Sequence, residues 1–208
     1  MNTITMTSAA LGALALTCAT ASASSLNIAG DISSSNGGTG SAFSATLDYV
    51  FGSGSTGSLT IVMTNDSSAS VGGFLTGFVF NIDSMDSGAS ATLSTGTDTD
   101  FLNTGNENAS PFGTFDAGAA LGANWSGGGS PSAGMGVGAT ETFVFTINAS
   151  DASSLSSSHF HGGDGSGFAV RFRGLNNGGS DKVLATVPTP GTSSIALLGL
   201  ALTTRRRR

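Results

Sequence analysis

Apolar and polar residues alternate along several short stretches of this chain. In one of them Leu59, Ile61 and Met63 fall on one face, and polar or smaller residues fall on the other. Such period-two alternation, bounded by Gly, Asn, Asp and Ser, is typical of half-buried β-strands. Between residues 24 and 187 no apolar pattern keeps a helical period for three turns. The other alternating sets are Leu47, Tyr49 and Phe51; Phe78, Phe80 and Ile82; Phe143, Phe145 and Ile147; and Phe168, Val170 and Phe172.

These stretches predict an all-β fold, an antiparallel β-sandwich of jelly-roll-like type. Glycine- and serine-rich residues 33–41 and 126–138 are expected to form long loops. Residues 149–157 are expected to form one capped helical turn and no more. Residues 52–57 match a Gly-x-Gly-x-x-Gly motif, but another strand pattern follows, so a hairpin is expected instead of a nucleotide site. The predicted core is built around six phenylalanines: Phe78, Phe80, Phe143, Phe145, Phe168 and Phe172.

The first 23 residues have the pattern of a secretory signal peptide. Residues 9–16 form an apolar segment that is too short to span a bilayer as a stable helix. Ala21 and Ala23 supply the small residues that a signal peptidase requires, which predicts a mature chain beginning at Ser24. Such a chain would lack the single cysteine, Cys18, and would contain no disulfide. The alternative is that residues 1–23 form a buried helix of the domain.

The last 22 residues fall into three parts. The first part is extended by two prolines and contains Val187, Pro188, Thr189 and Pro190. Residues 192–204 are predominantly apolar and predict a short transmembrane helix. Residues 191–204 would rise only about 21 Å as a helix, short of the ~30 Å hydrocarbon core. The final part stops transfer across the membrane, because it consists of Arg205, Arg206, Arg207 and Arg208.

This tail, together with the N-terminal signal, resembles the PEP-CTERM sorting signal of bacterial exosortase substrates. Thr189 replaces the central glutamate of the motif, as in planctomycete-type members. The resemblance implies an ectodomain at residues 24–186 and a sorting tail at residues 187–208. It also implies a transient inner-membrane anchor with a cytoplasmic C-terminus, cleavage by an exosortase-like membrane protease, and delivery to the cell surface or the extracellular space. Association with exopolysaccharide follows from the same resemblance. The alternative is an ordinary tail-anchored protein.

Charge is distributed very unevenly along the 208 residues. Four of the seven basic residues are the terminal arginines, and the other three are Arg171, Arg173 and Lys182. Without the terminal arginines, three basic residues stand against thirteen acidic ones, a formal net charge of −10. A domain this acidic has no excess of positive charge to attract a phosphate backbone, so we expect no nucleic-acid partner.

Candidates for a metal site are sparse. Asp98 and Asp100, with Glu107 and Asp116 further along, are the candidate calcium ligands, although no EF-hand pattern is present. Solvated turn acids are the default interpretation of these residues, and calcium binding is the alternative. His159 and His161, the only histidines, would begin a metal site if both rings projected from one face of a strand, but we expect them to lie in a solvated loop. We expect no other cofactor.

Catalytic motifs are missing from the sequence. No Gly-x-Ser-x-Gly elbow occurs, and cleavage after residue 23 would remove the only cysteine. The sequence therefore predicts a non-enzymatic protein, and the resemblance to exosortase substrates implies that the mature exported domain is structural or adhesive. The alternative is an exported carbohydrate-binding module or glycan-acting enzyme, which would require a groove lined by Trp125, Tyr49 and paired carboxylates.

Overall fold

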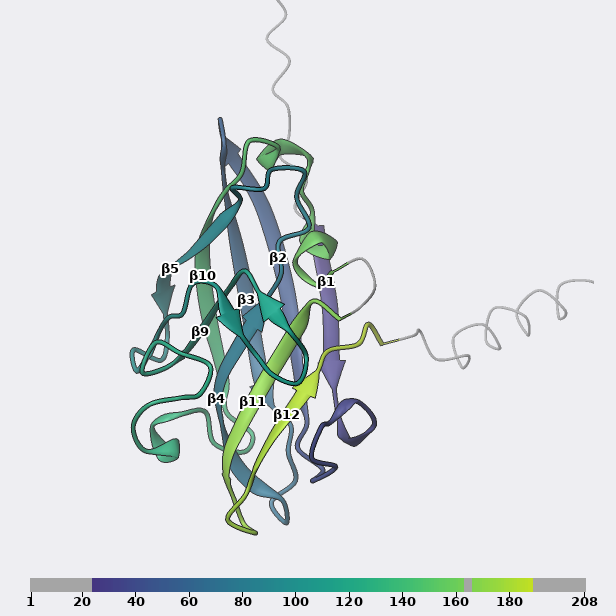
Figure 1. The fold of residues 1–208 in the computed structure, drawn as a ribbon, viewed down its shortest axis with the longest axis vertical. Coiled ribbons are helices and arrows are strands. Elements are labelled where there is room, and N and C mark those ends of the chain that lie inside the picture. Colours follow the sequence, from purple (N-terminus) through teal and green to yellow (C-terminus); the bar gives the residue numbers. More distant parts are fainter. Residues whose placement is uncertain (1–23, 163–165, 189–208) are drawn as a thin grey trace, which may run out of the picture.

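Two five-stranded antiparallel sheets, packed face to face, make up the domain (Figure 1). The computed structural model of the chain describes residues 24–162 and 166–188. The first sheet has the order β1-β2-β3-β10-β5, which are Ser24–Gly30, Phe43–Ser53, Thr56–Asn65, Thr140–Asn148 and Ser90–Gly96. The second has the order β12-β11-β4-β9-β6, which are Ser180–Leu184, Phe168–Leu175, Gly72–Phe80, Ala117–Leu121 and Phe101–Asn103. The prediction of an all-β, sandwich-like fold is confirmed.

The core between the sheets is rich in phenylalanine, as predicted. All six expected rings are fully buried. The ring of Phe78 on β4 lies 4.9 Å from that of Phe143 on β10 and 5.9 Å from that of Phe168 on β11. Phe80 meets Phe145 edge to face at 5.0 Å. Because side chains alternate along a strand, each sheet presents these rings to the other sheet. The outer face of the first sheet is mostly polar, whereas part of the outer face of the second sheet is covered by a second apolar cluster.

The β2–β3 connection is a tight hairpin, which confirms the interpretation of residues 52–57. Ser53 pairs with Thr56, and the turn between them includes Gly54 at a φ of +58°. Gly57 is required for a different reason. A Cβ atom added there would lie 2.2 Å from the hydroxyl oxygen of Tyr49, so only glycine lets the tyrosine ring cross this position.

Helical structure in the described residues is limited to short 3₁₀ turns, which are Ile32–Ser34, Pro131–Ala133, Ala152–Ser154 and Ser157–Phe160. The predicted capped turn in residues 149–157 is therefore corrected to two 3₁₀ turns, of which the second runs on to Phe160. Asp151, at the N-cap of the first, makes no capping bond. Its carboxylate instead accepts hydrogen bonds from the Ser84 hydroxyl and the Met85 amide, which fasten the loop after β4.

The predicted signal peptide at residues 1–23 and the predicted transmembrane segment at residues 192–204 lie outside the described residues. Within residues 24–162 and 166–188, no helix has the length and apolar character needed to cross a membrane.

Candidate functional site

The predicted sorting tail leaves the domain along strand β1. The Ala29 amide donates to the Thr186 carbonyl oxygen at 2.9 Å, and the Thr186 amide donates back to the Ala29 carbonyl oxygen at 2.6 Å. The Thr186 hydroxyl adds a bond to the same oxygen at 3.1 Å. Val187 and Pro188 follow directly and are exposed. The remaining predicted tail residues lie outside the described residues: Thr189, Pro190, Arg205, Arg206, Arg207 and Arg208.

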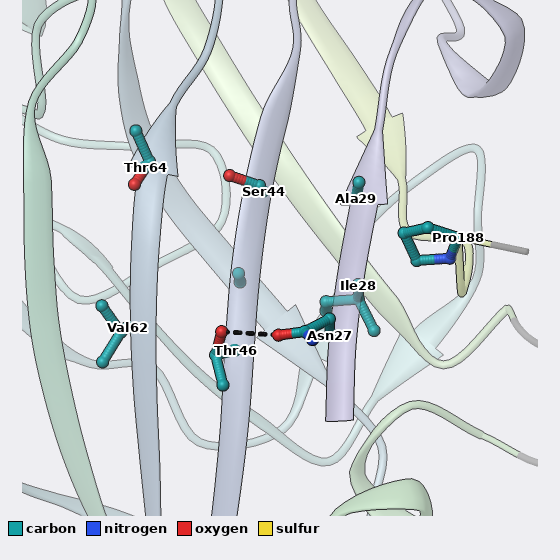
Figure 2. Close-up of a pocket in the computed structure, with 9 residues that line it drawn as sticks. Asn27, Ile28, Ala29, Ser44, Thr46, Val62, Thr64 and Pro188 are labelled. Carbon is teal, nitrogen blue, oxygen red and sulfur yellow. Dashed lines mark hydrogen bonds between the residues drawn. The ribbon is translucent and has the colours of Figure 1, made fainter. Parts of the chain in front are cut away.

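An open hollow of about 270 Å³ lies beside this exit, on the outer face of the first sheet (Figure 2). Strands β1, β2 and β3 form its floor, and the ring of Pro188 stands at its edge. The Thr46 hydroxyl donates to the Asn27 side-chain oxygen at 2.8 Å across the floor. None of its side chains titrates near neutral pH; they are Asn27, Ile28, Ala29, Ser44, Ala45, Thr46, Val62, Thr64 and Pro188. The hollow therefore offers surface contact and no acid–base chemistry.

The predicted N-terminal cleavage position lies on the same strand. Ser24 opens β1 and pairs with Tyr49 of β2, whereas Ala21 and Ala23 lie outside the described residues. Five residues separate Ser24 from Ala29, which corresponds to about 17 Å along an extended strand. Strand β1 thus carries the predicted mature N-terminus at one end and the exit of the tail at the other.

The four candidate calcium ligands do not come together. Asp98 and Asp100 lie in the turn between β5 and β6, where the Asp100 amide donates to the Asp98 carboxylate at 2.9 Å. The Asp116 carboxylate accepts the Ile82 amide at 2.8 Å, and Glu107 belongs to the small β7–β8 hairpin (Glu107–Asn108 and Thr114–Phe115). Across the part of the chain that the structure describes, no three His, Cys, Asp or Glu side chains form a group suited to a metal ion.

The surroundings of Asp98 include an acid that the sequence did not point to. Burial raises the pKa of Asp98, and the charges of Asp100 and of Glu141 on β10 raise it further. The hydrogen bond from the Asp100 amide acts in the opposite direction but does not outweigh them. Glu141 was missed because it lies far along the chain and reaches this turn only through the pairing of β10 with β5.

The two histidines do not lie on a strand, and the expected solvated loop is wrong for His161. His159 lies in the 3₁₀ turn Ser157–Phe160, and its Nδ1 accepts the Ser156 amide at 3.0 Å, which caps that turn. His161 follows the turn and is almost fully buried, so a solvated loop does not describe it either. The capping bond provides a structural reason for a histidine at position 159.

Trp125 and Tyr49 do not line a common groove. Tyr49 is buried in the main core, where its hydroxyl donates to the Ala152 carbonyl oxygen at 2.7 Å. Trp125 is 3% exposed and belongs to a second cluster, on the outer face of the second sheet. The other buried members of this second cluster are Val79, Ala109, Phe115 and Ala169. The tryptophan is therefore a packing residue and presents no stacking surface.

A group of cations borders the second cluster on the same outer face. Arg171 and Arg173 on β11 and Lys182 on β12 form this group, which we call the basic patch. Arg171 and Lys182 are directly opposite each other in the antiparallel pairing. Each of these side chains donates a hydrogen bond to a backbone carbonyl oxygen of a neighbouring loop. Arg171 donates to Trp125 at 3.1 Å and Arg173 donates to Gly128 at 3.3 Å. Lys182 donates to Ser110.

One buried carboxylate was not anticipated. Asp181 is 2% exposed and accepts hydrogen bonds from the Ser35 hydroxyl at 2.7 Å, from the Gly37 amide at 2.9 Å and from Thr39. Burial on its own raises the pKa of Asp181, but the bonds from Thr39, Ser35, Gly37 and the Lys182 amide together lower it below the usual value. In the structure Asp181 pairs with the buried Phe172 across β11 and β12. The sequence would hint at burial of Asp181 only if this strand pairing were known.

Comparison with known proteins gives no relative from which a function could be transferred. No protein-family model, no curated protein and no solved structure matches the chain significantly.

Proposed function

We propose that this chain is an exported cell-surface or extracellular-matrix protein whose sandwich domain is structural or adhesive. In this proposal a signal peptidase removes residues 1–23, the tail holds the precursor transiently in the inner membrane, and an exosortase-like protease then cuts near Val187, Pro188, Thr189 and Pro190. The mature domain associates with exopolysaccharide.

The observation that carries the proposal is the extent of the folded domain. Strand β1 includes Ser24, which is both the first residue that the structure describes and the predicted start of the mature chain. The last backbone bonds to the sandwich are made by Thr186, one residue before the predicted sorting motif. Every sheet pairing among residues 24–162 and 166–188 therefore lies between the two predicted cleavage positions.

The exit geometry is consistent with access by a membrane protease. Pro188 is exposed and lies at the rim of the hollow on β1, β2 and β3 (Figure 2). Because proline restricts the backbone to extended conformations and has no N–H to donate, this segment is suited to a protease cleft rather than to addition as a further strand.

The topology also supports the jelly-roll-like form that we propose for the sandwich. The chain passes from one sheet to the other at the β3–β4, β4–β5, β5–β6, β9–β10 and β10–β11 connections. Such repeated crossing between two antiparallel sheets is typical of jelly rolls.

The alternative, a carbohydrate-binding module or glycan-acting enzyme that uses Trp125 and Tyr49, is less well supported. Both side chains are buried, in separate clusters. A sugar ring stacks on an exposed aromatic face, and neither residue offers one.

The proposal is tested by expressing the full chain in a bacterium that encodes an exosortase and in a strain lacking that enzyme. Mass spectrometry of the surface fraction should show a product that begins at Ser24 and lacks residues 205–208. The strain without the enzyme should retain a membrane-held precursor, as should a Pro188→Ala, Pro190→Ala variant in the first strain. A surface product that still contains the terminal arginines would refute the sorting mechanism.

A further inference from the structure

All the basic side chains of the described residues gather on the outer face of the β11–β12 hairpin, whose two strands lie side by side in Figure 1. Cross-strand neighbours such as Arg171 and Lys182 have Cβ atoms about 5 Å apart, and like charges so placed repel each other. Arg173 follows on the same strand and face, about 7 Å from Arg171. In a chain with thirteen acidic residues, the three Lys and Arg side chains of the described residues thus lie close together.

No carboxylate neutralises this basic patch. Within residues 24–162 and 166–188, the hydrogen bonds of the three cations go to backbone carbonyl oxygens, and none of the cations forms an ion pair. The carboxylate of Asp181, next to Lys182 in sequence, is engaged by Ser35 and Thr39 on the other side of the strand. Among the described residues, no carboxylate therefore offsets the repulsion within the patch.

Hydrogen-bonding capacity remains available in the patch. A guanidinium has five N–H donors, and Arg171 uses one of them on Trp125. Its Nε is buried, so the donors left for a ligand are the remaining N–H groups at the end of the side chain, which lines the hollow described below. Burial lowers the pKa of Arg171, and the charge of Arg173 lowers it further, so an anion placed between the two would relieve both effects.

An open hollow of about 350 Å³ gives access to both arginines. Arg171 and Arg173 line it together with Pro131, Gly174 and Ser180. Gly174 has a φ of +66°, and a Cβ atom there would come within 3.1 Å of Pro131, so glycine keeps this side of the hollow free. A shallow, open site on a rigid sheet is suited to one or two groups of an extended polymer.

We propose that the basic patch binds the carboxylate or sulfate groups of an acidic glycan. The arginine fork is matched to oxyanions of this geometry, and the spacing of Arg171 and Arg173 allows two groups of one polymer to bind together. The net charge of −10 on the domain repels a densely charged polymer such as DNA more strongly than a sparsely charged glycan. The inference deepens the proposed function by naming a ligand class, and it relies on that function only for the extracellular setting.

The test measures binding of the full chain, purified in detergent, to immobilised polygalacturonate, dextran sulfate, neutral dextran and duplex DNA. All variants carry Gln at positions 205–208, because four terminal arginines would bind any polyanion. We expect binding to polygalacturonate, to dextran sulfate or to both, whichever oxyanion the patch prefers. Arg173→Gln should weaken that binding about tenfold or more, the loss expected for a charge-assisted contact.

The matched control is Asn148→Asp, which changes the net charge by the same amount at the exposed last residue of β10, in the other sheet. It should leave binding unchanged, and thermal unfolding should show each variant to be folded. Arg171→Lys, which keeps the charge but not the fork, should bind more weakly than the unaltered patch. The proposal is overturned if Asn148→Asp weakens binding as much as Arg173→Gln, if an Arg171→Gln, Arg173→Gln variant binds normally, or if neutral dextran or DNA is preferred. Each of these results is independent of whether the tail is processed in cells.

Discussion

Thr39 donates to the carboxylate of Asp181 through both its amide and its hydroxyl, although 142 residues separate the two in sequence. Ser35 and Gly37 donate to the same carboxylate, so one buried side chain organises the glycine-rich loop between β1 and β2. The fold of this loop therefore depends on a strand that is formed near the end of the chain. A buried carboxylate with several donors and no cation is stable only while all of those donors are in place.

Asp181→Asn should lower the free energy of unfolding by about 2 kcal/mol, because hydrogen bonds to a charged acceptor are lost and an amide group faces N–H and O–H donors. Urea titration at neutral pH measures the loss. Asp48→Asn, on the outer face of β2, is the control and should change little, since no hydrogen bond to its side chain is formed within the described residues.

The stabilising effect of the Asp181 carboxylate should depend on pH in a specific way. Since the folded-state pKa of Asp181 lies below the value of about 3.9 for an unfolded aspartate, its carboxylate stabilises the fold fully above that pH. The stabilisation is lost as the pH falls through the folded-state pKa. The stability difference between the unaltered chain and Asp181→Asn should therefore shrink below about pH 4. A difference that stays constant down to pH 2 would contradict the role assigned to this carboxylate.

Phe78→Ala should lower the free energy of unfolding by about 3–5 kcal/mol, because it leaves a cavity between two closed sheets. The ring contacts Phe143, Phe145 and Phe168, so the loss is shared by both sheets. Phe51→Ala, at a half-buried position on β2, should cost clearly less. Equal losses in chemical denaturation would show that the core is not centred on Phe78.

Thr186→Pro should release the start of the tail from β1, because proline has no N–H to donate to the Ala29 carbonyl oxygen. Loss of this bond and of the hydroxyl bond should cost about 1–2 kcal/mol. Thr186→Ala removes only the hydroxyl and should be milder. Hydrogen exchange of the Ala29 amide gives a local measurement, and faster exchange is expected only in the proline variant.

The single tryptophan provides a direct optical test of the second cluster. Trp125 is 3% exposed, so its emission should be shifted to the blue and poorly quenched by acrylamide. Addition of neutral oligosaccharides should not change the spectrum. An emission typical of solvent-exposed indole, or a shift on addition of sugar, would restore Trp125 as a stacking residue.

The strands that the sequence predicted correctly are those with one strongly apolar face. Leu59, Ile61 and Met63 are all fully buried, as their alternation requires. Strand β5 was not predicted because it is an edge strand with mostly exposed small and polar residues, and β6 has only three residues. The period-two signal requires several apolar residues at alternate positions of one strand, which neither β5 nor β6 has.

Contacts between distant segments limited the prediction of sites. The position of Trp125 among glycine and serine residues carries no periodicity, so its burial follows only from the loop that covers the second sheet. The basic patch could be anticipated in part, because Arg171, Arg173 and Lys182 flank the turn at residues 176–179. The local sequence could not show that these three cations have no carboxylate partner among the described residues. That property depends on where the acidic residues lie in the folded structure.

The bond pair between Ala29 and Thr186 has a consequence for the order in which the chain acquires structure. Strand β1 is synthesised first, yet one of its contacts waits for Thr186, 157 residues later. The interior strands β10 and β11 also come late, and without them β5 has no partner and β4 lacks one neighbour. A growing chain therefore cannot complete the first sheet until β10 ends at Asn148, or the second until β12 ends at Leu184. Such non-local pairing makes folding slow. In the export route that we propose, the polypeptide should thus remain extended long enough to pass through a narrow channel, and should gain its rigidity only when almost all of it has emerged on the far side.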